Sequence, residues 1–202
     1  MKKTQSRHAA SGKRTSDIIQ AALACFTELG FNNTSMADIC TRANASTGSV
    51  YHHFKSKELL AAAVYLEGIE TYQSGLLEIF KKEKDPYDGI SSVIEYHLKW
   101  VQNNPDWAQF LFQKRHSSFL VETENALITL NKKFKQGIEG WFKHHIKAGK
   151  IRPLAWDVII SLLLGPCQEY TKLYMSKKTV TKIDEAVHEL SLAAWSSLAQ
   201  EQ

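Results

Sequence analysis

The sequence predicts an all-α protein of about nine helices, in which an N-terminal three-helix domain precedes a larger helical domain. Apolar residues recur at helical spacing along almost all of the 202 residues, and no segment shows the alternation of a half-buried strand. All four prolines lie beyond residue 85. Pro86, Pro105 and Pro153 stand at expected helix starts, where a missing N–H is tolerated.

The first helix is expected to follow Thr15-Ser16-Asp17, because a hydroxyl cap and an acid both suit a helix N-terminus. It should end at Gly30, since glycine readily adopts the left-handed conformation that often follows a helix. Its apolar face is formed by Ile18, Ile19, Ala22, Phe26 and Leu29.

Two short helices come next. Ser35 and Asp38 have the spacing of a capping box, which should open a helix that runs through Ala43. Asn44 suits the left-handed conformation of a tight turn, and Ser46 is expected to cap the third helix. Together the three helices make a helix-turn-helix arrangement.

The remaining chain predicts longer helices. Ser56 is expected to cap the fourth helix, which should run to about Lys82. Gly165-Pro166 lies inside a later helix and should kink it, because proline removes one hydrogen bond. The other expected helices span residues 86–103, 106–118, 121–148, 155–176 and 180–199.

Composition excludes several classes of protein. Hydrophobic residues make up 44% and charged residues 23%, as in soluble globular domains, and no segment has the ~20 apolar residues of a membrane span. The first sixteen residues lack the apolar core of a secretory signal. Cys25, Cys40 and Cys167 have neither disulfide-framework nor zinc-site spacing, which favours a reducing cytoplasm.

The net charge of +4 belongs to one end of the chain. Residues 1–60 hold eight Lys or Arg and four acidic residues, whereas the remainder holds 17 of each. A basic end on a neutral body indicates that this end meets a polyanion, although a solvated tail has the same composition.

Two segments carry a family resemblance. Residues 34–39 read TSMADI and residues 43–60 read ANASTGSVYHHFKSKELL. With Leu29-Gly30-Phe31, they resemble the DNA-binding domain of TetR/AcrR-type transcriptional regulators over roughly residues 14–62. The chain departs from the family pattern at Asn44, where glycine is usual, and at Ala45, where a larger aliphatic residue is usual.

The resemblance implies a cytoplasmic homodimer that binds a near-palindromic operator in double-stranded DNA. It further implies a repressor that a small apolar or aromatic effector releases. The domains would be a flexible basic arm (1–14), the helix-turn-helix domain (15–60) and an effector-binding and dimerisation domain (61–202). The arm would contact the minor groove or phosphates, or remain a frayed terminus.

The residues around the third helix suit DNA contact. Gly48 permits close approach, and Ser46, Thr47 and Ser49 place short hydroxyls at a helix N-terminus, where free N–H groups attract phosphate. The helix has no Arg, Asn or Gln, so base reading should depend on thymine methyl groups, DNA shape and a few short side chains. The expected contacts are Thr34, Ser35, Arg42, Ser46, Thr47, Gly48, Ser49, Tyr51, His52, Lys55 and Lys57.

Several of these residues have alternative roles. Ser35 and Ser46 would cap helices whether or not they also touch phosphate. Tyr51 would contact phosphate or pack on the first helix. His52 and His53 point in different directions, so we expect one to contact DNA and the other to pack or to cap a helix.

The body of the chain combines aromatic and polar residues between residues 72 and 142. The polar residues among the aromatics include His97, Gln113, His116 and Asn125, and such a mixture is typical of small-ligand sites. Each aromatic has the alternative role of an ordinary core residue. The expected ligand-binding residues are Tyr72, Tyr96, Trp100, Trp107, Phe110, Gln113, Phe134 and Trp141.

The last two helices carry apolar stripes that predict a dimer interface. In the family such a helix pair meets its copy in a four-helix bundle. The expected interface residues are Ile159, Leu163, Ile183, Val187, Leu190 and Ala194.

Two alternative functions are compatible with parts of the sequence. His144-His145 with Glu139 suggests an enzyme, but no H-E-x-x-H, G-x-S-x-G or Walker motif accompanies them. We therefore expect no catalytic residue, metal or cofactor. The second alternative keeps the helix-turn-helix but makes the body a protein–protein module without a small-molecule effector.

Overall fold

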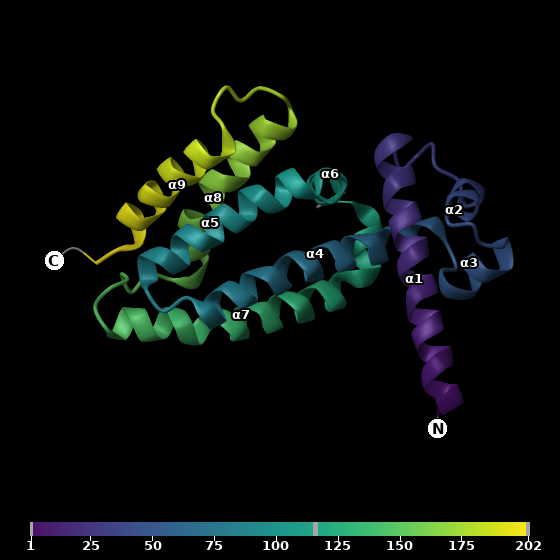
Figure 1. The fold of residues 1–202 in the computed structure, drawn as a ribbon, viewed down its shortest axis with the longest axis horizontal. Helices are drawn as coiled ribbons and strands as arrows, with labels where there is room; N and C mark the ends of the chain where they lie inside the picture. Colours follow the sequence, from purple (N-terminus) through teal and green to yellow (C-terminus); the bar gives the residue numbers. More distant parts are fainter. Residues whose placement is uncertain (1, 115–116, 201–202) are drawn as a thin grey trace. The chain divides into compact units, whose positions relative to one another are not determined.

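The computed structural model describes residues 2–114 and 117–200, and these are helical apart from connections and one isolated bridge between Ile151 and Ala199 (Figure 1). The predicted all-α fold class is confirmed. The described helices are α1 (Lys2–Glu28), α2 (Met36–Arg42), α3 (Thr47–His53), α4 (Lys57–Lys82), α5 (Pro86–Asn103), α6 (Pro105–Lys114), the 3-10 helix η1 (Ser118–Thr123), α7 (Glu124–Lys147), α8 (Trp156–Met175) and α9 (Ile183–Leu198).

Helix α1 begins earlier than the sequence analysis predicted. Its first residue is Lys2, so Thr15-Ser16-Asp17 lie inside the helix and the predicted cap at this position is wrong. The segment before Thr15 contains Lys, Arg, Gln and Ala and no proline, so continuing the helix costs little. The end of α1 agrees with the prediction, because Gly30 follows it with a φ of 82°.

The local signals of the helix-turn-helix are confirmed. The Ser35 N–H donates to Asp38 Oδ2 at 2.8 Å, and the Asp38 N–H donates to Ser35 Oγ at 3.2 Å, which completes the capping box of α2. Asn44 has a φ of 46°, as the tight turn requires. Ser46 caps α3 by accepting a hydrogen bond from the Ser49 N–H at 3.2 Å.

The later helices follow the predicted order with one difference. The helix expected over residues 106–118 ends at Lys114, and η1 precedes α7. Ser117 has an extended conformation at the start of η1. Serine hydroxyls compete for backbone hydrogen bonds, so the Ser117-Ser118 pair is a weak point in a continuous helix.

The chain folds into two compact units. Unit 1 contains Met1–Ile69 and Asp106–Leu127, and unit 2 contains Glu70–Pro105 and Ile128–Gln202. Helix α4 contributes its first half to unit 1 and its second half to unit 2. The segment 106–127, which lies far beyond the helix-turn-helix in the sequence, therefore packs with it.

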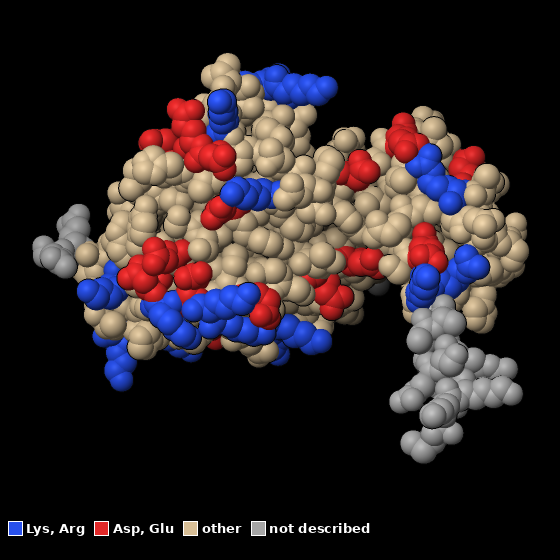
Figure 2. Space-filling model, viewed as in Figure 1, with Lys and Arg blue, Asp and Glu red and all other residues tan. Residues whose placement is uncertain are grey.

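Charges on unit 2 are mixed, as the neutral balance of this part of the sequence predicts. Figure 2 shows basic side chains gathered along α7 with acidic side chains beside them. One such pair joins Lys143 Nζ to Glu139 Oε1 at 3.0 Å. Among the described residues, no helix has both the length and the apolar character needed to cross a membrane.

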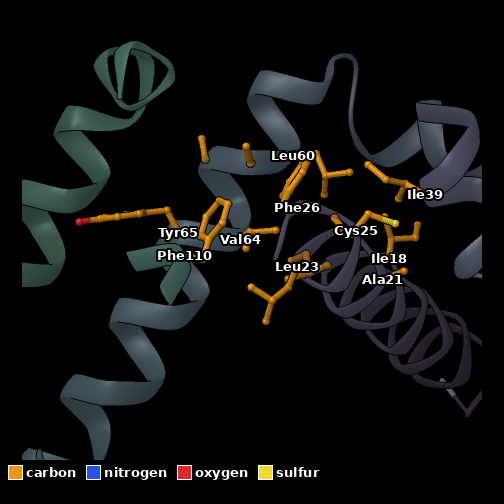
Figure 3. Close-up of a cluster of buried hydrophobic side chains, with 14 of the residues drawn as sticks. Ile18, Ala21, Leu23, Cys25, Phe26, Ile39, Leu60, Val64, Tyr65 and Phe110 are labelled. Atoms are coloured by element: carbon orange, nitrogen blue, oxygen red, sulfur yellow. The ribbon is translucent and has the colours of Figure 1, made fainter. Parts of the chain in front are cut away.

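The core of unit 1 joins α1, α2, α4 and α6 (Figure 3). Ile18, Ile39 and Leu60 are completely buried in it. Phe110 of α6 stacks on Phe26 of α1, with 5.6 Å between ring centroids. The core holds the helix-turn-helix in a fixed arrangement, because interiors pack densely in few side-chain conformations.

The core of unit 2 is built from α4, α5, α7, α8 and α9. Its largest fully buried side chains include Ile90, Ile94 and Leu98 of α5. Gly75 is needed for packing, because a Cβ there would overlap the Tyr96 hydroxyl. Helix α5 lies against both α8 and α9.

Candidate nucleic-acid interface and effector site

The helix-turn-helix exposes the N-terminal end of α3 and, later in the same helix, Tyr51 and His52. The side chains of Ser46, Thr47, Tyr51 and His52 are exposed, and Tyr51 retains 41% of its surface. An open groove beside this end runs between α2 and α3. It is lined by Ala37, Cys40, Thr41, Asn44, Ala45, Ser46 and Thr47.

Gly48 is exposed on the same surface, and packing within unit 1 does not require a glycine at this position. A Cβ at this position would have no neighbour within 4 Å apart from its own helix. Glycine also lowers helix stability relative to alanine. The free space around it is available to a partner that approaches the backbone of α3 closely.

The adjacent histidines have different surroundings, as expected. His53 is half-buried, and its Nδ1 lies 3.3 Å from Thr15 Oγ1 of α1. His52 is exposed on the outer side of α3. His53 thus attaches the recognition helix to α1, and His52 remains available to a partner.

Arg42 belongs to a contact between α1 and α2. Its guanidinium donates to both carboxylate oxygens of Glu28, with 2.6 Å between Nη1 and Oε1. This hydrogen bond lowers the pKa of Glu28 below its ordinary value. The pairing directs the Arg42 side chain toward the end of α1 instead of toward α3.

The Thr34 side chain is turned inward, which corrects the expectation that it faces DNA. Only 2% of Thr34 is exposed. Its hydroxyl lies 3.1 Å from the Cys25 carbonyl oxygen and 2.8 Å from that of Gly30, and donates to them. These hydrogen bonds attach the connection that leads into α2 to the C-terminal end of α1.

Lys57 and Lys55 also differ in their surroundings. Lys55 is exposed, whereas the Lys57 ammonium contacts backbone carbonyls between α1 and α2. The side chains of the predicted arm before Gly12 lie outside those that the structure describes.

The expected ligand-binding residues are divided between the two units. Trp107, Phe110 and Gln113 belong to unit 1. Phe110 is 2% exposed and packs in the core beneath α1, and its predicted ligand-binding role stays a prediction. His116, noted among the polar residues, lies outside the described residues.

Unit 2 holds the other five residues, and three of them form an aromatic cluster. The Tyr72 ring centroid lies 5.2 Å from that of Trp100 and 5.7 Å from that of Tyr96. Trp141 packs on Phe80 at 5.1 Å between ring centroids. Phe134 is half-buried against the same core.

A buried histidine joins the cluster to α8. His97 Nδ1 lies 2.6 Å from the Tyr72 hydroxyl oxygen, and His97 Nε2 lies 3.2 Å from Thr171 Oγ1. Burial lowers the pKa of His97 to about 4 and raises that of Cys167 to about 12. It also raises the pKa of Tyr72, so all three groups are neutral near pH 7.

His97 is one of the polar residues among the aromatics of the sequence but not one of the predicted ligand-binding residues, and Thr171 was not predicted at all. The sequence did contain a signal that His97 is buried, because it lies on the apolar face of α5 with Val93, Ile94, Leu98 and Val101. Thr171 carried no such signal, because its partner lies on another helix.

The predicted dimer interface is largely part of the protomer's own core. Ile159, Leu163, Ile183 and Ala194 are each less than 9% exposed, and they pack within unit 2. In the folded protomer these four side chains are therefore core residues, and the position of the dimer interface stays a prediction. The apolar stripes of α8 and α9 pack against α5 and against each other. The sequence pattern alone does not distinguish this packing from dimerisation.

Other apolar residues of α8 and α9 face outward. Val158, Leu173 and Leu192 are each about 40% exposed. Val187 and Leu190, also predicted in the interface, are partly buried against the core.

Comparisons with known proteins agree with this architecture. Residues 18–64 match the family model described as bacterial regulatory proteins, tetR family, and residues 65–200 match a tetracyclin repressor-like C-terminal domain. The HTH-type transcriptional regulator RutR of Escherichia coli K12 is 24% identical over 184 residues, covering 90% of this chain and 84% of RutR. UidR of the same strain is 37% identical over 76 residues, covering 38% of this chain and 35% of UidR.

Solved structures share the fold over most of the chain. A transcriptional regulator FadR from Bacillus subtilis, in complex with stearoyl-CoA, has a TM-score of 0.77 at 18% identity and covers 90% of this chain and 97% of its own. A TetR family regulator from Marinobacter aquaeolei VT8 has a TM-score of 0.76 at 16% identity, with coverages of 96% and 99%.

Proposed function

The chain belongs to the TetR family of bacterial regulatory proteins, and we propose that it is a transcriptional repressor that a small apolar or aromatic molecule releases from its operator. The observation that carries the DNA-binding part is the exposed N-terminal end of α3, with Gly48 at its surface. Recognition helices of helix-turn-helix proteins enter the major groove by this end.

The proposed DNA contacts follow from exposure. Ser35, Ser46, Thr47, Gly48, Tyr51, His52 and Lys55 are exposed, and Ser49 is half-buried beside them. Short hydroxyls and Tyr51 would contact phosphates or base edges, and Lys55 would neutralise a phosphate. Thr34 and Arg42 would act indirectly, by holding α1 and α2 together.

A homodimer is the proposed functional form, because two recognition helices must reach two half-sites of a near-palindrome. The outward residues Val158, Leu173 and Leu192 are the proposed contacts between copies. Such a regulator would act in the cytoplasm, where its DNA is.

The proposed effector site is the aromatic cluster of Tyr72, Tyr96 and Trp100 in unit 2. Among the described residues, the buried polar side chains are threonine, serine and histidine, with no buried carboxylate, lysine or arginine. A neutral apolar ligand suits this environment, since burying an unpaired charge is costly. The acyl chain of stearoyl-CoA, which the Bacillus subtilis FadR structure contains, belongs to this chemical class.

The test has two stages. DNA fragments retained by the purified protein are sequenced, and a shared near-palindrome is the expected result. Hydrophobic compounds are then titrated while tryptophan fluorescence and release from that operator are followed together. Recovery of no enriched sequence contradicts sequence-specific binding, and compounds that bind without releasing DNA contradict effector control. A ligand must prefer the non-DNA conformation to release it, and a coupling of ~1–3 kcal/mol is typical.

A further inference from the structure

Lys57 is the first residue of α4, and its side chain is turned back onto the connection between α1 and α2 (residues 29–35). The Nζ atom lies 2.8 Å from the Phe31 carbonyl oxygen, 2.9 Å from that of Thr34 and 3.4 Å from that of Asn32. It also lies 4.6 Å from the centroid of the Phe31 ring. All these groups belong to unit 1.

These contacts use the full donor capacity of the ammonium. A lysine ammonium has three N–H donors, and three carbonyl oxygens surround this one. The ring of Phe31 adds a cation–π attraction. A phosphate could take a hydrogen bond from Lys57 only by displacing one of these carbonyls.

The connection that Lys57 holds leads directly into the start of α2. Thr34 precedes Ser35, whose capping box with Asp38 opens the helix. The Thr34 hydroxyl holds the same stretch from the other side, through the carbonyls of Cys25 and Gly30. The N-terminus of α2 is thus fixed between the end of α1 and the start of α4.

We infer that Lys57 is a positioning residue for DNA binding, which orients the N-terminus of α2 through the carbonyls of residues 31, 32 and 34 and does not neutralise a phosphate. The inference rests on the proposed DNA-binding function. It assigns this lysine a role different from that of its neighbour Lys55, which is exposed and has the same charge.

The salt dependence of DNA binding separates the two roles. Each phosphate neutralised changes the slope of log K against log salt by about 0.9, so a positioning residue leaves the slope unchanged. Binding of a mixed-sequence 30-base-pair duplex, a length of about three helical turns, is measured from low to moderate salt for the wild type, Lys57→Met and the matched control Lys55→Met. We expect Lys57→Met to bind roughly tenfold more weakly with the wild-type slope. Lys55→Met removes one phosphate contact from each protomer of the proposed dimer, so it should lose about 1.8 of the slope.

A charge-conserving variant provides a second test of the role of Lys57. Lys57→Arg retains the positive charge, but its planar fork does not match three converging carbonyls. Positioning predicts that Lys57→Arg binds as weakly as Lys57→Met, whereas a phosphate contact predicts that arginine restores binding. If Lys57→Met does not fold, the DNA affinity of Lys57→Arg relative to the wild type still tests the inference.

Hydrogen exchange provides a readout that is independent of DNA. The Ser35 and Asp38 amides should exchange faster in Lys57→Met than in the wild type or Lys55→Met.

DNA binding of every variant is measured at a temperature where thermal melts show that the variant is folded. At that temperature, replacing a residue that only stabilises the fold would leave the DNA affinity unchanged. A loss of about 1.8 in the slope of Lys57→Met, which is one phosphate contact for each protomer of the dimer, overturns the inference, and so does unaltered affinity in that variant. If the wild type binds no duplex DNA at low salt, the proposed function fails, and the exchange rates still decide whether Lys57 holds the connection.

Discussion

The Tyr72 hydroxyl and the Nδ1 atom of His97 lie 2.6 Å apart and connect α4 to α5 inside unit 2. The other ring nitrogen of His97 lies within hydrogen-bond distance of Thr171 on α8. The two helices that carry the proposed effector site, α4 and α5, are therefore joined to each other and to α8 by one chain of neutral polar groups. A ligand that binds there would act on helices that already share this chain.

Removing the Tyr72 hydroxyl tests the contribution of this chain to stability. Tyr72→Phe keeps the ring contacts but leaves His97 Nδ1 without its partner, and an unsatisfied buried group costs ~1–3 kcal/mol. We expect the urea midpoint to fall accordingly, with an unchanged m-value. Tyr51→Phe is the control, because its hydroxyl is on an exposed side chain and its removal should leave the midpoint in place.

The lowered pKa of His97 predicts that stability falls as the pH is lowered. An unfolded histidine takes up a proton near pH 6.5, whereas His97 in the folded protein does so only near pH 4. Between these values the unfolded state binds more protons, so the free energy of unfolding decreases as the pH falls from 6.5 to 4. The total decrease from this group is roughly 3 kcal/mol, and His145, whose pKa burial also lowers, adds in the same direction.

Chemical denaturation at closely spaced pH values measures this effect. A His97→Gln variant, which cannot take up a proton, should show a clearly flatter profile in the same window. An identical profile in the variant would assign the pH dependence to other groups.

Gly48→Ala should raise stability while weakening DNA binding. A Cβ at this position meets no neighbouring atom in unit 1, and alanine is favoured over glycine in a helix by about 1 kcal/mol. On DNA the same methyl group would hold α3 away from the groove. Thermal melting and duplex binding are measured together, with Gly140→Ala of α7 as the control, since its position is equally open and should gain stability without losing affinity.

The outward apolar residues of α8 and α9 should hold two copies together. Leu173→Glu with Leu192→Glu is expected to leave the helical content intact and to give a monomer in sedimentation, because two charges would be buried in the contact. Operator affinity should fall with the loss of the dimer. Val180→Glu is the control, because Val180 is fully exposed between α8 and α9 and outside both helices. A double variant that still sediments as a dimer would place the contact elsewhere.

Features that depend on nearby residues were readable from the sequence. The caps at Ser35 and Ser46 and the left-handed turn at Asn44 agree with the structure, because each involves atoms only a few residues apart. The number and order of helices followed from apolar spacing for the same reason. The start of α1 was the exception. The cap signal at Thr15 does not begin the helix, because the residues before it include good helix formers and are already helical.

Side-chain roles that depend on distant partners were settled only by the tertiary structure. The sequence by itself determined an all-helical chain with a helix-turn-helix and its exposed recognition helix. It could not place Lys57 on the carbonyls of residues 31, 32 and 34, Arg42 on Glu28, or Phe110 on Phe26, because these partners are 14 to 84 residues away. Nor could it separate stripes that cover the protomer's core, such as Ile159 and Ile183, from stripes that face another copy. Periodicity records only that one face of a helix avoids water, and packing decides what covers that face.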